Sequence, residues 1–263
     1  MDPQKPFVNP LKQMLKQGKK TAGSWLHMGS PIASEIVGRA GFDWVIIDME
    51  HGPADIMTLI SQTQAISGGN TVPLVRVPWN DFVVIKRVLD AGAFGLIIPY
   101  VNTKEEAEAA VAACKYPPEG IRGLAGSTRA AWHNQFAKNY FSTANDEILI
   151  MTQVETQTAV DNLDEMLEVP GIDGIFIGPM DLATSMGHLA DPSPPEVQST
   201  IREVEEKVKK SGKFLATISG NWDQAKGLYD RGYQLISLMA DGVALAATAA
   251  GKISDFRKEF PDG

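Results

Sequence analysis

The sequence predicts an α/β fold organised as a single (β/α)₈ barrel, or TIM barrel. Eight short apolar runs rich in β-branched residues recur along the chain, and helical patterns with start signals separate them. No GxGxxG motif follows the first run, so the main signature of a dinucleotide-binding open sheet is missing. The length of 263 residues suits one barrel-sized domain over 1–263.

The eight apolar runs are predicted to be strands. Most of them are nearly continuous hydrophobic stretches, which is typical of parallel strands buried on both faces. In chain order they cover residues 21–27, 44–50, 71–77, 95–101, 148–155, 174–181, 213–220 and 234–241.

Helix start and stop signals lie between these runs. Asn80 and Asn221 can each cap a helix, and Thr103 with Glu106 has the spacing of a capping box. Several helices are expected to end in glycine just before the next strand, as C-cap chemistry requires. These glycines are Gly41, Gly92, Gly171, Gly212 and Gly232.

Two segments fall outside the repeat. A short N-terminal helix is expected before the first strand. Residues 116–147 hold Pro117, Pro118, Trp132 and several glycines without a clear strand, and we interpret them as a long inserted loop. The aromatic residues in this segment favour order over disorder.

Composition narrows the possible partners. The net charge of −8 argues against nucleic acid or an anionic membrane surface as the main partner. The only cysteine, Cys114, excludes an intramolecular disulfide, and its helical, alanine-rich context suggests an inert thiol. There is no signal-peptide pattern and no run of about 18 apolar residues, so we expect a cytoplasmic protein.

Polar residues gather where the predicted strands end. In such barrels the carboxyl ends of the strands carry the catalytic groups. The residues at these ends are Trp25 and His27 on the first strand, Asp48, Glu50 and His51 on the second, Arg76 on the third, Gln153 and Glu155 on the fifth, and Asp181 on the sixth.

Glu155 and Asp181 are candidate metal ligands. Isolated carboxylates are costly to bury, and a hard divalent cation such as Mg²⁺ or Mn²⁺ prefers oxygen ligands. An ion-pair network is the alternative, but Arg76 is the only strand-end cation. Arg76 itself could clamp a carboxylate, stabilise an oxyanion, or form a structural salt bridge to Asp48 or Glu50.

The sequence also contains a candidate for acid–base catalysis, but it contains no lysine suited to imine catalysis. His51 is a candidate general base, with a hydrogen-bonded structural role as the alternative. No lysine lies between Lys138 and Lys207, and Lys213 begins a strand at the wrong end of the barrel. Schiff-base catalysis is therefore not expected, and metal polarisation of a carbonyl is favoured instead.

The strand-end motifs resemble those of the 4-hydroxy-2-oxoheptanedioate aldolase family. That family contains class II pyruvate aldolases of the phosphoenolpyruvate/pyruvate barrel type, related to 2-keto-3-deoxy-rhamnonate aldolase, 5-keto-4-deoxy-glucarate aldolase and macrophomate synthase. The resemblance extends over roughly residues 20 to 250. The matching runs are Gly23-Ser24-Trp25-Leu26, Asp48-Met49-Glu50-His51-Gly52, Val75-Arg76-Val77-Pro78, Tyr116-Pro117-Pro118-Glu119-Gly120-Ile121-Arg122-Gly123, Gln153-Val154-Glu155-Thr156 and Gly178-Pro179-Met180-Asp181-Leu182.

The resemblance implies a binding site for a 2-oxo acid. Glu155 and Asp181 would hold Mg²⁺, Mn²⁺ or Co²⁺, and the metal would bind pyruvate or a related 2-oxo acid. Gln153 and the backbone N–H groups of Met180 and Asp181 would hold that substrate, and Trp25 would border it.

The resemblance also implies catalytic roles and an assembly. Arg76 would stabilise the enolate, and His51 would be the base. Asp90 would raise the basicity of His51, although the predicted barrel places Asp90 near the opposite end. Either a neighbouring subunit supplies Asp90, or this role does not carry over to the present chain. A homo-oligomer is implied, specifically a hexamer arranged as a trimer of dimers.

One position departs from the family pattern. The last strand ends in Leu238-Met239-Ala240-Asp241, where a small Gly-Ser pair would be expected before the aspartate. We therefore expect Met239 to narrow the pocket for the aldehyde.

The predicted function is reversible cleavage of a 4-hydroxy-2-oxo acid into pyruvate, or a related 2-oxo acid, and an aldehyde, in aromatic or sugar-acid catabolism. One alternative is a lyase acting on citramalyl- or malyl-CoA, although no basic cluster suited to CoA is present. Another is a barrel that binds a 2-oxo acid and metal without turnover.

Overall fold

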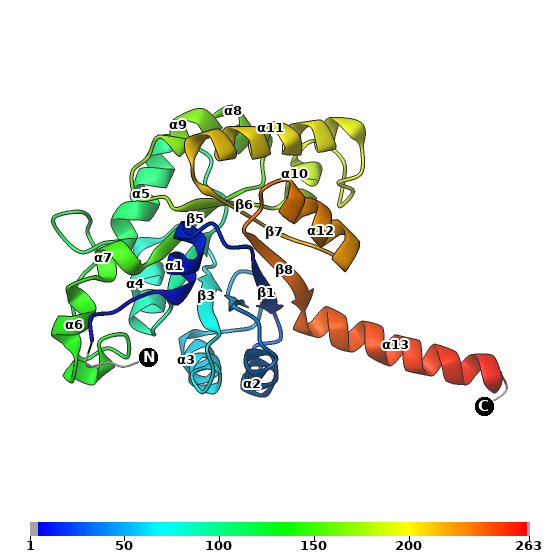
Figure 1. The fold of residues 1–263 in the computed structure, drawn as a ribbon, viewed down its shortest axis with the longest axis horizontal. Helices are drawn as coiled ribbons and strands as arrows, with labels where there is room; N and C mark the ends of the chain where they lie inside the picture. The colour runs from blue at the N-terminus through cyan, green and yellow to red at the C-terminus, as the bar shows by residue number, and fades with distance from the viewer. Residues whose placement is uncertain (1–4, 262–263) are drawn as a thin grey trace.

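The computed structural model describes residues 5–261, and these form a closed barrel of eight parallel strands in the order β1 to β8 (Figure 1). The predicted (β/α)₈ fold is therefore confirmed. The strands are β1 (Thr21–Leu26), β2 (Trp44–Asp48), β3 (Val72–Arg76), β4 (Gly95–Ile98), β5 (Leu149–Val154), β6 (Gly174–Ile177), β7 (Phe214–Ile218) and β8 (Leu235–Ala240).

Helices surround the barrel and connect its strands. They are α1 (Pro10–Lys16), α2 (Pro31–Arg39), α3 (Ile56–Ile66), α4 (Phe82–Asp90), α5 (Lys104–Cys114), α6 (Ala137–Phe141), α7 (Ala144–Glu147), α8 (Gln157–Asp161), α9 (Leu163–Leu167), α10 (Pro179–Ser185), α11 (Pro195–Ser211), α12 (Trp222–Asp230) and α13 (Asp241–Glu259).

Most predicted helix signals are confirmed. Asn221 accepts the backbone N–H of Gln224, and Thr103 accepts that of Glu106. The five glycines expected at C-caps all have positive φ. The Asn80 prediction is wrong, because Asp81 caps α4. The side chain of Asn80 instead donates to the carbonyl of Glu106 at 2.9 Å.

Strand alternation divides the core into two layers. Trp25, Ile46 and Leu74 point into the barrel, where they belong to one buried cluster. The residues that follow them on the strands point outward into a second cluster against the helices. A polar residue that continues the inward series therefore faces the mouth of the barrel.

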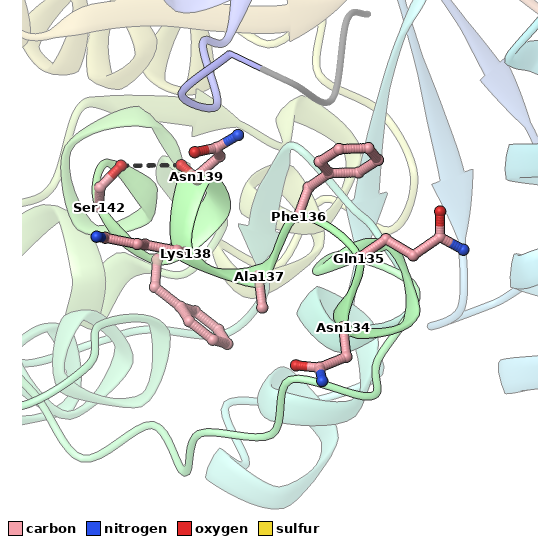
Figure 2. A pocket seen from close by; sticks show the side chains of 8 residues that line it. Asn134, Gln135, Phe136, Ala137, Lys138, Asn139 and Ser142 are labelled. Carbon is pink, nitrogen blue, oxygen red and sulfur yellow. Dashed lines mark hydrogen bonds between the residues drawn. The ribbon is translucent and has the colours of Figure 1, made fainter.

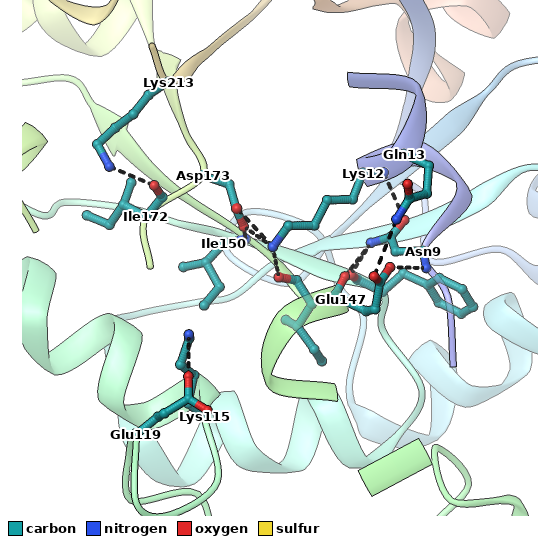
Figure 3. A network of polar contacts seen from close by, with 12 residues as sticks. Asn9, Lys12, Gln13, Lys115, Glu119, Glu147, Ile150, Ile172, Asp173 and Lys213 are labelled. Atoms are coloured by element: carbon teal, nitrogen blue, oxygen red, sulfur yellow. Dashed lines mark hydrogen bonds and ion pairs between the residues drawn. The ribbon is translucent and has the colours of Figure 1, made fainter. Parts of the chain in front are cut away.

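The N-terminal helix α1 closes the amino end of the barrel. Leu11 and Leu15 are buried in the inner cluster. Lys12 is buried with them, and its Nζ lies 2.8 Å from the Asp173 carboxylate and 3.0 Å from the Ile148 carbonyl (Figure 3). Both charged groups of this buried ion pair are thus hydrogen-bonded, as buried charges require.

The segment 116–147 is not the bare loop that its sequence suggests. It contains a 3₁₀ turn (Trp132–Asn134), α6 and α7, and it has a small apolar cluster of its own. The Arg122 guanidinium is buried over the Tyr116 ring at 4.5 Å and donates to Asp90 at 2.8 Å. The segment therefore packs at the C-terminal end of α4, which ends at Asp90.

The last helix, α13, extends away from the barrel (Figure 1). Beyond Ala244 every described residue of this helix is exposed. Its exposed side chains include Val243, Leu245, Ile253 and Phe256. A barrel of this type normally packs its final helix against the sheet, so α13 lacks its usual apolar environment.

Candidate active site

Three polar side chains stand side by side at the mouth of the barrel. Leu26 pairs with Ile47, so His27 stands level with Asp48, and Asp48 pairs with Arg76. All three continue the inward series of their strands. Adjacent strands therefore present His27, Asp48 and Arg76 as one row.

The Asp48 carboxylate is the centre of this row. Its Oδ1 accepts Arg76 Nε at 3.0 Å, and its Oδ2 accepts Arg76 Nη2 at 2.6 Å. Oδ2 also lies 3.1 Å from Trp25 Nε1 and 2.9 Å from His27 Nδ1. Burial would raise the pKa of Asp48, but its hydrogen bonds and the Arg76 charge lower it to about 2. Asp48 is therefore an ionised acceptor at neutral pH.

Arg76 is held by two carboxylates and one ring. Besides the two bonds to Asp48, its Nη1 lies 2.9 Å from Glu50 Oε2, and its guanidinium lies 4.7 Å from the centre of the Trp25 ring. The structural salt bridge considered for Arg76 is thus present. A guanidinium has more N–H groups than these contacts use, so donors remain for an oxyanion.

Three carboxylates gather at the mouth: Glu155, Asp181 and Glu50, the last of which contacts Arg76. Glu155 is buried, and desolvation raises its pKa to about 7, with smaller contributions from Glu50 and Asp181. Desolvation also raises the pKa of Glu50, to which Asp48 and Asp181 contribute. The negative charge here exceeds what Arg76 alone can compensate.

The backbone of Tyr100 orients Glu155. The N–H of Tyr100 donates to Glu155 Oε1 at 2.7 Å. Tyr100 has a φ of 57°, a left-handed conformation that costs a non-glycine residue about 1 kcal/mol. Its ring stacks on Trp79 with 5.4 Å between centroids, which helps to hold this backbone in place.

Gln153 and α10 complete this side of the site. Gln153 is buried, its Nε2 donates to Glu155 Oε2, and its Oε1 has no hydrogen-bond partner among the described residues. Asp181 does not end a strand as predicted, because β6 stops at Ile177 and Asp181 lies in the first turn of α10. There the backbone N–H groups of Met180 and Asp181 belong to the helix start, where intrahelical acceptors are lacking.

His51 and Asp90 are not brought together within one chain. The His51 side chain is 63% exposed, and its Nε2 lies 3.7 Å from Glu50 Oε1. Asp90 ends α4 and pairs with Arg122. A role for Asp90 beside His51 therefore needs a second subunit.

Met239 does not line the pocket as expected. It packs with the outer cluster, whereas Ala240 packs with the inner one. The cause is an irregularity in the pairing of β1 with β8, where Gly23 faces Ser237 but Ser24 faces Met239. The extra residue turns the Met239 side chain away from the barrel interior.

Other candidate features lie elsewhere. A cavity of about 660 Å³ is lined by residues 134–139, 141 and 142 of the inserted segment, and Figure 2 shows their side chains. None of these residues is acidic or a histidine. Lys213 donates hydrogen bonds to the Val169 and Ile172 carbonyls at the amino end of the barrel, far from an imine site.

Burial raises the pKa of Cys114 to about 12, so this thiol is not a nucleophile. No helix within residues 5–261 is long and apolar enough to span a membrane.

The donor set fits a hard cation. Glu155 and Asp181 offer carboxylate oxygens, and the buried Gln153 Oε1 is an unused acceptor beside them. The described residues contain no group of three or more acidic, histidine or cysteine side chains arranged to enclose a metal. A cation held here would take its remaining oxygens from water and substrate, as Mg²⁺ commonly does.

An eight-stranded barrel with carboxylates, an arginine and a histidine at its carboxyl end has the layout of a barrel lyase. A model of the HpcH/HpaI aldolase/citrate lyase family matches residues 21–248, and the chain belongs to that family. It is therefore a carbon–carbon lyase.

Named relatives agree with this assignment. The chain is 42% identical over 254 residues to a 5-keto-4-deoxy-D-glucarate aldolase of Escherichia coli O157:H7, covering 96% of this chain and 98% of the relative. The enzyme of that name from Salmonella paratyphi C is 41% identical over the same shares. A crystal structure of an HpcH/HpaI aldolase/citrate lyase family protein from Burkholderia cenocepacia superposes with a TM-score of 0.91 at 36% identity, covering 95% and 100% of the two chains. The narrower 4-hydroxy-2-oxoheptanedioate assignment stays a prediction.

Sequence reasoning missed three supports of this site. Asp48 was noted at a strand end, but its role as the common acceptor for three side chains was not. Asp241 accepts the backbone N–H groups of His27 and Met28, which fixes the end of β1. The Tyr100 N–H has no sequence signal, because every residue except proline carries one.

Proposed function

We propose that this protein is a metal-dependent, class II aldolase that reversibly cleaves a 4-hydroxy-2-oxo acid into pyruvate, or a related 2-oxo acid, and an aldehyde. The observation that carries the proposal is the arrangement of Glu155, Gln153 and Asp181 opposite the Arg76–Asp48 pair. The first group supplies oxygen ligands in excess of the available positive charge, and the second supplies fixed N–H donors. The names of the relatives favour a sugar-acid substrate.

Each residue has a definite task in this proposal. Glu155 and Asp181 hold Mg²⁺, Mn²⁺ or Co²⁺, which when bound polarises the 2-oxo group as a Lewis acid. Gln153 and the backbone N–H groups of Met180 and Asp181 orient the 2-oxo acid. The Trp25 ring forms the floor below it.

The carbon–carbon bond breaks between the metal-binding residues and the Arg76–Asp48 pair. His51 accepts the proton of the C4 hydroxyl, and the C3–C4 electron pair passes into the 2-oxo group as the aldehyde leaves. Arg76 stabilises the resulting enolate oxygen with its remaining N–H groups, a contribution of the kind that is often worth about 10²-fold or more in rate. Asp48 keeps Arg76 from turning away.

The test is a retro-aldol screen with pyruvate detection over several 4-hydroxy-2-oxo acids, with divalent metal and with a chelator. We expect pyruvate from at least one substrate in metal and none after chelation. His51→Ala and Arg76→Ala should each reduce turnover by about 10²-fold or more with the fold retained. Absence of pyruvate from every substrate in the presence of metal would overturn the proposal.

We also propose that the protein is a homo-oligomer, with a hexamer as the expected form. The support is α13, whose Ile253 and Phe256 are 51% and 46% exposed. On α2 of the same barrel, Ile32 and Ile36 are 73% and 67% exposed. A second copy that laid its α13 against α2 would bury both apolar faces and complete the helical ring, which is a common way to form a dimer. A cytoplasmic location is a further proposal.

A further inference from the structure

His27 is the residue of the polar row that the proposed reaction leaves without a task. It follows β1 directly, and its backbone N–H donates to the buried Asp241 carboxylate at 2.9 Å. Its Nδ1 lies 2.9 Å from Asp48 Oδ2, while 47% of its side chain is exposed. One edge of the ring is therefore anchored, and the other edge faces the mouth of the barrel.

The contact with Asp48 fixes which ring nitrogen carries the proton. Asp48 is an ionised carboxylate, which can only accept hydrogen bonds. Nδ1 must therefore donate, so in the neutral ring Nε2 keeps a free lone pair. The single negative charge of Asp48 is already paired with Arg76, so the contact does not require a second cation.

The position of His27 determines which part of a substrate it can meet. The barrel order places β1 four strands from β5, so His27 lies across the mouth from Gln153 and Glu155. A 2-oxo acid held at β5 and α10 would project its far end, the half that leaves as the aldehyde, toward β1. A lone pair presented there is complementary to a hydroxyl group.

We propose that His27 is a specificity-determining residue whose Nε2 accepts a hydrogen bond from a hydroxyl on the leaving half of the substrate, so that the site favours polyhydroxylated 4-hydroxy-2-oxo acids. This inference rests on the proposed aldolase function and adds the acceptor class to it. His27 differs in this from His51, whose ring makes no short hydrogen bond with any residue between 5 and 261 and can serve the reacting C4 hydroxyl.

The test compares two substrates of equal carbon number in the metal-loaded wild type and in His27→Ala. One substrate releases glyceraldehyde and the other releases propanal, so only the leaving-half hydroxyls differ. We expect His27→Ala to lower kcat/KM about tenfold more for the glyceraldehyde-releasing substrate than for the propanal-releasing one, as loss of one hydrogen bond predicts. His27→Asn supplies a second variant, with a smaller side chain. Met28 lies beside His27 on the rim, and Met28→Ala should change kcat/KM by the same factor for both substrates.

A second readout separates specificity from disruption of the polar row. Exchange of the pyruvate methyl protons in D₂O needs the 2-oxo acid site but no leaving half, and we expect His27→Ala to keep it within about twofold. Equal losses for both substrates, or no loss for either, would overturn the role of His27. A wild type that forms no pyruvate and exchanges no protons would instead overturn the aldolase proposal itself.

Discussion

At the scale of single residues, Asp48 organises the mouth of the barrel without being a metal ligand in the proposed site. It accepts side-chain hydrogen bonds from Arg76, Trp25 and His27, and the backbone N–H of Glu50 at 3.0 Å. Removing its charge would leave the Arg76 guanidinium with Glu50 as its one ionic partner among the described residues. The direction in which Arg76 presents its free donors therefore depends on Asp48.

Asp48→Asn tests this dependence. We expect turnover to fall about 10²-fold, because an amide cannot accept every N–H that now points at the carboxylate and Arg76 loses its fixed orientation. Steady-state kinetics with pyruvate detection measures the effect. Asp55→Asn is the matched control, since Asp55 is an exposed helix cap and asparagine caps equally well. Wild-type turnover in Asp48→Asn would contradict the role given to Asp48.

Glu155 makes cation binding depend on pH. Its pKa of about 7 lies above the usual 4.5, so the cation-free folded protein keeps a proton that the unfolded chain has released. Its contribution to stability is thus complete below pH 4.5 and is lost as the pH rises through 7. Because a cation requires the ionised carboxylate, Mg²⁺ affinity should rise with pH up to about 7, approaching about tenfold per pH unit below it.

Thermal unfolding with and without Mg²⁺ at pH 6 and pH 8 checks this. We expect Mg²⁺ to raise the Tm more at pH 8, and Glu155→Gln to abolish the rise at both values. An equal rise at both pH values in the wild type, or a rise that persists in Glu155→Gln, would show that Glu155 does not bind the ion.

At the scale of secondary-structure elements, α1 seals the end of the barrel opposite the site. Leu11 is fully buried against the inner cluster, while the active-site row lies at the other end of the strands. Leu11→Ala should therefore lower the free energy of unfolding by about 3 kcal/mol, through lost burial and the cavity left behind. Specific activity of the folded fraction should be unchanged.

Chemical denaturation with activity measured on the folded protein tests this separation. Lys16→Ala, at an exposed position in the last turn of the same helix, is the control and should stay within about 0.5 kcal/mol of the wild type. A loss of specific activity in Leu11→Ala that exceeds its loss of folded protein would show that α1 also shapes the mouth of the barrel.

Elements were predictable from the sequence where local chemistry decides the structure. All eight strands follow from apolar periodicity, and the Asn221 cap and the Gly212 C-cap follow from their side chains. The exact residues at which the strands end were harder to predict. Asp181 reads as the end of an apolar run, but Pro179 begins a helix two residues after β6 stops.

Long-range packing decides the parts that sequence patterns did not reveal. The short helices of residues 116–147 are held by Arg122, which lies over the Tyr116 ring and reaches Tyr140 and Asp90, 18 and 32 residues away in the chain. The outward turn of Met239 depends on a pairing irregularity with β1. Neither effect has a local sequence pattern. The residue types at the site and the strands that carry them could therefore be predicted, but their side-chain contacts could not.

At the scale of the whole molecule, α13 indicates that one chain is an incomplete unit. In proteins most of the stability of a helix comes from packing of its apolar face, so the exposed apolar residues of α13 need a partner surface. Ile253→Glu should lower the oligomeric state, because it places a charge in the proposed interface with α2.

Light scattering coupled to size-exclusion chromatography measures that change. Lys252→Glu, at the neighbouring position of the same helix, also places a glutamate on α13 but should leave the assembly intact. A wild-type chain that is monomeric at micromolar concentration, or an Ile253→Glu variant with unchanged mass, would contradict the role proposed for α13.

The central claim is that Glu155 and Asp181 hold a cation that stabilises a 2-oxo acid enolate. The most direct measurement is exchange of pyruvate methyl protons in D₂O, followed by NMR, because it requires enolate formation but no aldehyde. We predict rapid exchange with Mg²⁺ or Mn²⁺ present, with loss to the uncatalysed rate on chelation and in both Glu155→Gln and Asp181→Asn. Exchange that persists in the chelated protein, or at wild-type rate in both variants, would contradict the claim.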